Sequence, residues 1–388
     1  MPPQNLTPRQ ILDHLVAFPT ISRDSNLDLV DWVDAYLHSH GVKSHRYYNA
    51  EGTKAALFAN VGPEVPGGVI LSGHTDVVPV DGQDWTTDPF TVVERDGRLY
   101  GRGTCDMKGF DALALAAVPL ALKAGVKRPL QIALSFDEEL GCTGAPPMIE
   151  EIVKTLPRAA LAIIGEPSMM KTVNGHKGGA GYRVKVKGFE VHSSLLPQGV
   201  SAIMEAARLI GWLNAQNELF MAKPVTALAA MFDPPHTTVH CGMFSGGTAH
   251  NITAGDCSFV METRVVPGED AEALALAFEA ECAALDARVK AIRPEAGVTW
   301  ERFFDVPPLV PEPNGAAEAQ VRRVTGDNGV SVVSYGTEAG QFQAAGYSAV
   351  ICGPGDIAQA HQRDEYLDLA QFEAGWAFMQ RLVAELAQ

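Results

Sequence analysis

The stretch that decides the fold of this chain is Leu71-Ser72-Gly73-His74-Thr75-Asp76-Val77-Val78-Pro79. The apolar run 69–71 is of the kind that forms a buried strand. His74 and Asp76 would then lie just past the carboxyl end of that strand, where open α/β sheets bind their ligands. A neutral imidazole coordinates a metal ion, and a nearby carboxylate fixes the tautomer of the ring. A single His-x-Asp triplet is more often part of a surface loop than of a site, so this reading depends on acids elsewhere in the chain.

Length and charge limit the possible functions. The chain has 388 residues, more than the roughly 250–300 at which a single core stops growing, so we expect two domains. Its 46% hydrophobic and 20% charged residues are typical of an ordinary globular protein. The formal net charge of −16 argues against nucleic acid or an anionic membrane as a partner.

The cysteines and the apolar segments indicate a cytoplasmic protein. The six cysteines are scattered and form no Cys-x-x-Cys pair, as expected of reduced thiols rather than of a disulfide framework. The N-terminal segment has no basic stretch followed by an apolar run, so we expect no signal peptide. No window reaches the roughly 18 apolar residues that a membrane-spanning helix needs.

Strand-like and helix-like segments alternate along the first part of the chain. This alternation predicts an α/β fold with a doubly wound, mainly parallel sheet. Thr7 and Pro8 are typical of a helix N-cap and first helical residue, and a second helix is expected over 27–40. The predicted strands are 55–60, 69–72, 130–136 and 161–164, and a further helix is predicted over about 109–123.

The pattern changes near Gly175. The segment 183–187 alternates polar and apolar residues, as a strand with one solvated face does. A helix from 201, strand-like stretches at 237–244 and 256–265, and a helix over 270–287 follow. We therefore predict a smaller two-layer α+β domain inserted at 176–294 into a catalytic domain formed by 1–175 and 295–388.

Acidic residues and one late histidine recur where predicted strands end. Asp106 lies in Gly101-Arg102-Gly103-Thr104-Cys105-Asp106, which begins like a dinucleotide-binding loop but has an acid where the third glycine would stand. An acid there would face a pyrophosphate, so we reject nucleotide binding. Apolar strands run into Asp137-Glu138-Glu139 and into Glu166, and His361 follows a predicted strand at 348–352.

These residues form a plausible set of metal ligands. His74, Asp106, Glu139, Glu166 and His361 supply two imidazoles and three carboxylates, a mixture that suits one or two divalent ions such as Zn²⁺. Five ligands for two ions require one of them to bridge. Glu138 then remains for proton transfer.

The sequence resembles the M20 family of metallopeptidases and amidohydrolases. The matching segments, in the order of the family, are GHTDVVP, GRGTCDMKG, SFDEELG, IIGEP, EVHSS, AHNITAGD and AHQRDEYL. Within the family, 335–339 and 353–362 look most like acetylornithine deacetylases. The resemblance implies a metal-dependent amidohydrolase that converts N2-acetyl-L-ornithine to L-ornithine and acetate in arginine biosynthesis.

The resemblance also implies roles for individual residues. His74 and Glu166 would hold one ion and Glu139 and His361 the other, while Asp106 would bridge them and the Asp106–Met107 peptide would be cis. The ions would be Zn²⁺ or Co²⁺. Glu138 takes the position of the general base, and Asp76 that of the acid that supports His74.

The inserted domain would act as a lid and a dimer interface in a homodimer. His192 matches the histidine that, in dimeric members, reaches into the partner's active site. Asn251 and Arg264 match residues that hold the carboxylate of the substrate, an N-acyl amino acid. Glu338 is our candidate for recognising a side-chain ammonium group.

Two alternatives remain. A sibling hydrolase could cleave succinyl-diaminopimelate, another N-acyl amino acid or a dipeptide with the same metal residues. A non-enzymatic metal-binding relative is the other, but the presence of all five ligands and Glu138 argues against it.

Overall fold

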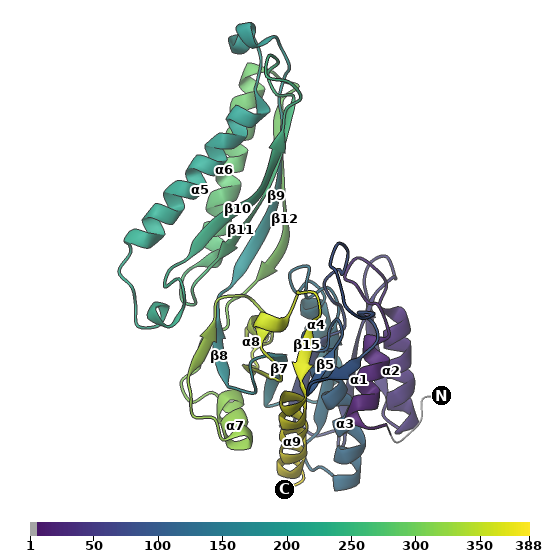
Figure 1. Ribbon diagram of the computed structural model, residues 1–388. Helices are drawn as coiled ribbons and strands as arrows, with labels where there is room; N and C mark the ends of the chain where they lie inside the picture. The colour runs from purple at the N-terminus through teal and green to yellow at the C-terminus, as the bar shows by residue number, and fades with distance from the viewer. Residues whose placement is uncertain (1–5) are drawn as a thin grey trace. The chain divides into compact units, whose positions relative to one another are not determined.

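The computed structural model describes residues 6–388, which form two compact units (Figure 1). Unit 1 comprises the chain up to Gly175 together with Leu309–Val332 and Thr337–Gln388. Unit 2 comprises His176–Pro308 and Val333–Gly336. No helix within residues 6–388 has the length and apolar character that crossing a bilayer requires.

Unit 1 is organised around an eight-stranded sheet. Its four central strands are parallel to one another, and antiparallel strands flank them. This is the mainly parallel α/β sheet that the sequence predicts. The strands follow in the order β1 (Ser44–Tyr48), β2 (Ala55–Val61), β6 (Leu130–Ser135), β3 (Val69–His74), β7 (Leu161–Pro167), β14 (Ser348–Gly353), β8 (Val173–His176) and β13 (Ser331–Val333).

Helices cover both faces of this sheet. Leu71 and Ile163 belong to a core shared with α1, α2, α3, α7 and α9. Their neighbours Ile70 and Ile164 are equally buried and point to the opposite face, on which α4 and α8 pack. The helices are α1 (Pro8–Val16), α2 (Leu27–Ser39), α3 (Lys108–Ala124), α4 (Ala145–Thr155), α7 (Ala316–Thr325), α8 (Ala339–Ala344) and α9 (Leu369–Leu386).

Local sequence explains where the first helix begins. The side chain of Thr7 accepts a hydrogen bond from the backbone N–H of Gln10, and the side chain of Gln10 bonds back to the backbone of Thr7. With Pro8 as the first helical residue, this capping box satisfies N–H groups that otherwise lack partners. The predicted start of the helix is therefore confirmed.

A small three-stranded sheet completes unit 1. It consists of β15 (Tyr366–Asp368), β5 (Arg98–Tyr100) and β4 (Val93–Arg95), all antiparallel. The pairing of β5 with β15 joins the segment before Asp106 to the segment after His361. A short 3₁₀ helix, Ile357–Gln359, precedes His361.

Unit 2 is an antiparallel four-stranded sheet with two long helices on one face (Figure 1). Its strand order is β10 (Thr238–Gly246), β11 (Asp256–Arg264), β9 (Gly179–Lys187) and β12 (Gly297–Val306). The helices are α5 (Ala202–Ala222) and α6 (Ala271–Ile292), with 3₁₀ turns at Ser193–Gln198 and Ala229–Met231. Along β9, Val184 and Val186 are buried while Lys185 and Lys187 are exposed, which is the alternation expected from the sequence.

The predicted end of the inserted segment at 294 is wrong. Strand β12 pairs with β9 along its length, and Trp300 lies opposite Val184. The segment 297–306 therefore belongs to the sheet of unit 2, and this unit continues to Pro308. The sequence analysis missed this fourth strand because its partner β9 lies more than a hundred positions earlier in the chain.

The core of unit 2 provides a test of its packing. Phe278 is 1% exposed, and its ring lies 5.0 Å from that of Tyr182. Replacing a buried phenylalanine by alanine leaves a cavity, so Phe278→Ala should lower the stability of unit 2 by about 3–5 kcal/mol. Hydrogen exchange of unit 2 peptides in increasing urea measures this change. Leu276→Ala, on the same helix but 54% exposed, is the control; equal effects would contradict the assignment of the core.

Candidate metal centre

The parallel strands of unit 1 end side by side, and the expected ligands lie at these ends. Strand β3 ends at His74, β7 contains Glu166, and β6 runs directly into 137–139. The segment after β14 carries His361, and Asp106 lies just before α3. Because parallel strands bring their carboxyl ends to one edge of a sheet, residues distant in sequence meet there.

Asp106 contacts both imidazole rings. Its Oδ1 lies 3.0 Å from Nε2 of His74, and its Oδ2 lies 3.3 Å from Nε2 of His361. Each ring thus faces a different oxygen of one carboxylate, which is the arrangement that a ligand bridging two ions requires. The peptide bond between Asp106 and Met107 is cis, as the resemblance implied.

A further carboxylate lies beside each ring. Nε2 of His361 is 3.1 Å from an oxygen of Glu139, and Nε2 of His74 is 3.9 Å from Oε1 of Glu166. These are the two pairs that the resemblance implied. The ligand atoms of His74, Asp106 and Glu139 also lie within 4.8 Å of one another, so the two halves form one cluster.

Glu138 belongs to the same cluster. Ligand-type atoms of His74, Glu138 and Glu166 lie within 4.8 Å of one another. Burial raises the pKa of Glu138 to about 7, and the negative charge of Asp106 adds to this effect. A carboxyl group whose pKa is close to the working pH can accept a proton and later return it.

Asp76 acts on this cluster in two ways. Nδ1 of His74 lies 2.8 Å from the backbone oxygen of Asp76 but 3.6 Å from its carboxylate. The carboxylate instead accepts hydrogen bonds from the backbone N–H groups of Glu138 and Glu139, at 3.2 and 3.3 Å, and from Ser22 Oγ at 2.7 Å. The backbone of Asp76 therefore orients the ring of His74, leaving Nε2 for a ligand, and its carboxylate holds the segment of Glu138 and Glu139.

The electrostatics of the cluster fit a divalent cation. Burial raises the pKa of Glu139 to about 8 and that of Glu166 well above its usual range, and the negative charge of Asp106 adds to both shifts. Hydrogen bonds with Asp106 and Glu139 raise the pKa of His361 to about 10. Carboxylates this close require protons or a cation between them. Two imidazole nitrogens with carboxylate oxygens are donors that Zn²⁺ accepts.

Glu338 lies at the start of α8. Its side chain is fully buried, and each carboxylate oxygen accepts a hydrogen bond from a serine at the end of a central strand, Ser135 of β6 or Ser72 of β3. Burial raises the pKa of Glu338 to about 7. This carboxylate joins α8 to the sheet, and its expected contact with a substrate ammonium group stays a prediction.

His192 and Asn251 are neighbours within unit 2. His192 pairs with Ile252 in an antiparallel bridge, and the N–H of Ser193 donates to the backbone oxygen of Asn251 at 2.9 Å. Nδ1 of His192 accepts a hydrogen bond from the backbone N–H of Ser194 at 3.2 Å. Ser194 Oγ also lies 2.8 Å from this nitrogen. A neutral ring that accepts at Nδ1 would carry its proton on Nε2.

Arg264 forms the end of β11, also in unit 2. Its guanidinium lies 2.9 Å from Glu262 of the same strand, and both side chains are 36% exposed. Ion pairs this exposed contribute little to stability, so a different carboxylate group can take the place of Glu262 as the partner of the Arg264 guanidinium. The roles expected of His192, Asn251 and Arg264 remain predictions.

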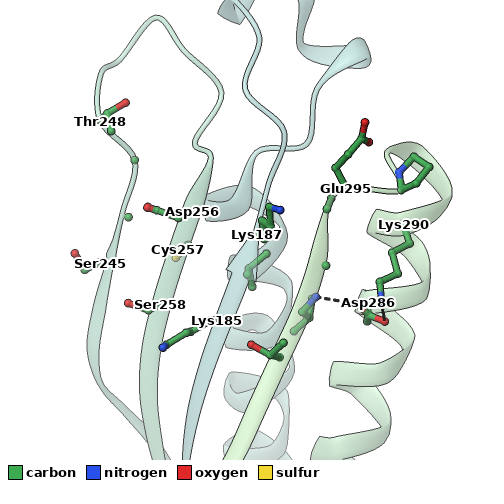
Figure 2. A pocket seen from close by; sticks show the side chains of 18 residues that line it. Lys185, Lys187, Ser245, Thr248, Asp256, Cys257, Ser258, Asp286, Lys290 and Glu295 are labelled. Atoms are coloured by element: carbon green, nitrogen blue, oxygen red, sulfur yellow. Dashed lines mark hydrogen bonds and ion pairs between the residues drawn. The ribbon is translucent and has the colours of Figure 1, made fainter.

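Unit 2 also contains a cavity of about 930 Å³ (Figure 2). Lys185, Lys187 and Ser258 from neighbouring strands line it, and on its helical side Asp286 forms a 2.7 Å ion pair with Lys290. Within residues 6–388, both side-chain groups with metal-ligand spacing lie in unit 1. The cavity therefore shares no residue with the candidate metal centre.

One acid near the centre was missed by the sequence analysis. Glu365 is buried, and its carboxylate accepts hydrogen bonds from the backbone N–H groups of Cys105 and Asp106. It stands in the segment AHQRDEYL, which the resemblance already marked. Its place in that segment, four residues after His361, was the available signal.

Comparison with known proteins identifies the family. The model of peptidase family M20/M25/M40 matches residues 70–385. The chain belongs to this family. A relative from Myxococcus xanthus named acetylornithine deacetylase is 36% identical over 389 aligned positions, covering 97% of this chain and 96% of the relative. This protein is therefore a hydrolase of the M20 group of metallopeptidases and amidohydrolases.

Solved structures share the fold of this M20 enzyme. An M20 metallo-carboxypeptidase from Sulfolobus solfataricus superimposes with a TM-score of 0.78 at 16% identity, covering 99% of this chain and all of the other. The protein YXEP from Bacillus subtilis, described as a dinuclear metal-binding M20 peptidase, gives a TM-score of 0.64 at 15% identity over 98% and 97% of the two chains.

The geometry of Asp106 predicts how metal binding responds to substitution. Because Asp106 faces both rings, Asp106→Ala should remove both ion positions, whereas His361→Ala should remove one and leave the other. Calorimetric titration of chelator-treated protein with Zn²⁺ gives the number of ions bound. His38→Ala, which changes a surface histidine paired with Asp34, is the control and should not alter that number. Equal Zn²⁺ binding by the Asp106 variant and the wild type would contradict the bridging role.

Proposed function

We propose that this M20 enzyme hydrolyses the amide bond of N2-acetyl-L-ornithine, releasing L-ornithine and acetate. The main support for the chemistry is the Asp106 carboxylate, which presents one oxygen to His74 and the other to His361. The support for the substrate is the relative named acetylornithine deacetylase, which matches nearly the whole chain.

The residues that would hold two divalent ions are already close together. His74 and Glu166 would bind one ion, His361 and Glu139 the other, and Asp106 both. Zn²⁺ is the ion we propose, with Co²⁺ as a substitute, because the donors are nitrogen and oxygen. When bound, such ions polarise a carbonyl group and lower the pKa of a water molecule towards about 7.

Glu138 would move the proton. As a carboxylate it takes a proton from the attacking water, and the resulting acid delivers that proton to the nitrogen of the departing amine. Its raised pKa suits both steps, because neither form is strongly favoured near neutral pH. Asp76 fixes the backbone of Glu138 and so positions this carboxyl group.

Three residues of unit 2 would act on the substrate. His192, with its proton on Nε2, would donate a hydrogen bond to the oxyanion that develops on the carbonyl, a contribution of roughly 3–4 kcal/mol per donor in other enzymes. Asn251 and Arg264 would hold the carboxylate of the N-acyl amino acid. These assignments rest on the family resemblance and on the local geometry of each residue.

The setting of the enzyme is part of the same proposal. We propose a cytoplasmic homodimer that functions in arginine biosynthesis, with the inserted domain, unit 2, as its lid and dimer interface. The acidic net charge of −16 supports a small-molecule substrate rather than nucleic acid or an anionic membrane.

A related hydrolase is the second candidate. The solved structures that share the fold include a tripeptidase from Staphylococcus aureus and a human carnosine dipeptidase. The metal residues do not distinguish an acetylated amino acid from a succinylated one or from a short peptide.

Replacing the general base tests the mechanism. Glu138→Gln keeps the shape of the side chain but cannot take a proton, so kcat should fall by about 10²–10⁴. Amine release and bound metal are both measured. Glu94→Gln, an exposed acid paired with Arg9, is the control and should leave kcat unchanged. A fall of less than about tenfold with metal bound would contradict the role of Glu138.

A substrate panel tests the proposed reaction. N2-acetyl-L-ornithine should give the highest kcat/KM among N-acetyl, N-succinyl and dipeptide substrates, and chelation should abolish activity that added Zn²⁺ or Co²⁺ restores. Release of free amine is the measurement. A preference for a dipeptide or a succinyl substrate would retain the hydrolysis but reject acetylornithine.

A further inference from the structure

A buried ion pair joins the segment that carries Asp106 to the segment that carries His361. Nη1 of Arg102 lies 2.7 Å from Oε2 of Glu365, and both side chains are 1% exposed. The function proposed above uses neither residue. Arg102 precedes Asp106 in one segment, and Glu365 follows His361 in the other.

Glu365 holds the backbone of Asp106. While its Oε2 binds Arg102, its Oε1 accepts hydrogen bonds from the N–H of Cys105 at 2.9 Å and from the N–H of Asp106 at 3.1 Å. One carboxylate therefore joins the guanidinium to the peptide groups immediately before the expected bridging ligand. Movement of Glu365 would move Asp106.

Arg102 reaches the His361 segment by two routes. Its Nη1 donates to the backbone oxygen of Gln362 at 3.3 Å, and its Nη2 donates to Oε1 of Gln83 at 2.7 Å. Nε2 of Gln83 in turn donates to the backbone oxygen of His361 at 2.9 Å. His361 has φ = 62°, a left-handed conformation uncommon for residues other than glycine. External hydrogen bonds of this kind maintain such a conformation.

The two expected ion positions depend on these contacts to different extents. His74 and Glu166 belong to β3 and β7, which are adjacent strands of the large sheet. His361 lies outside any strand, and its side chain is 52% exposed. Its distance from Asp106 is therefore not set by the ladder of the large sheet. The pairing of β5 with β15 brings the two segments together, and the network of Arg102, Glu365 and Gln83 continues that link towards His361.

We propose that Arg102 and Glu365 are positioning residues that fix His361 relative to Asp106 and so set the affinity of the ion position formed by His361 and Glu139. This inference rests on the metal centre of the proposed function. A buried ion pair adds little net stability compared with well-packed apolar residues. Its main effect here is to hold two ligand-bearing segments at a fixed separation.

The first test is Zn²⁺ titration of chelator-treated protein. In Arg102→Met, the ion held by His361 and Glu139 should bind about 10–100-fold more weakly, while the ion held by His74 and Glu166, which shares only Asp106 with this network, should lose less affinity. Saturating Zn²⁺ should then restore most of the activity, which a loss of a catalytic group would not allow. Arg102→Lys keeps the positive charge but not the planar guanidinium, so its affinity for the weakened ion should lie between those of the wild type and of Arg102→Met.

A matched control lies four residues earlier, at the start of β5. Arg98 forms a 3.2 Å ion pair with Asp368 of β15, but these side chains are 43% and 37% exposed and lie outside the network. Arg98→Met should leave both affinities unchanged. A wild-type affinity for both ions in Arg102→Met, or equal weakening of both, would overturn the proposal.

The second test needs no metal. Hydrogen exchange of the apoprotein should become about tenfold faster or more at the amides of Cys105 and Asp106 and around His361 in both Arg102→Met and Arg102→Met/Glu365→Gln. The double variant avoids leaving Glu365 charged and unpaired, so it guards against simple misfolding. Unchanged exchange in both segments would refute the positioning role. If exchange is faster in the variants but the wild-type protein binds no Zn²⁺, the metal centre is refuted and the link between the two segments is established.

Discussion

The crowding of carboxylates around Asp106 is the constraint on which the rest of unit 1 depends. Asp106, Glu139 and Glu166 would repel one another in a buried position, and the two imidazole rings together with protons or a bound cation must offset that repulsion. Holding such a group requires rigid surroundings. The structure provides them by placing the ligands at the ends of hydrogen-bonded parallel strands and by fixing the remaining segments with further polar contacts.

These supporting contacts act mainly through the backbone. The carboxylate of Asp76 binds the N–H groups of Glu138 and Glu139, and that of Glu365 binds the N–H groups beside Asp106. In both cases a buried acid stabilises a turn that presents other acids. The site therefore contains two layers of carboxylates, of which the inner one would face the proposed cations and the outer one satisfies peptide groups.

Much of this site could be predicted from sequence because its signals are local. A buried strand followed at once by an acid, as at Glu139 and Glu166, is visible in a short window, and so is the Thr7–Pro8 helix start. His361 carried no such signal by itself and was identified through its companions and the family resemblance. The features that the sequence did not reveal involve long-range contacts. Strand β12 depends on pairing with the distant β9, and the hydrogen bonds to the buried Glu338 come from the distant Ser72 and Ser135.

The position of β14 has a consequence for the order of folding. This strand lies between β7 and β8 in the large sheet, yet it follows the whole of unit 2 in the chain. During synthesis, unit 2 emerges almost complete while unit 1 still lacks a central strand. Domains tend to fold as they leave the ribosome, so we expect the inserted unit to fold first. The nascent N-terminal segment must then keep its apolar strand edges from aggregating until residues 348–353 arrive.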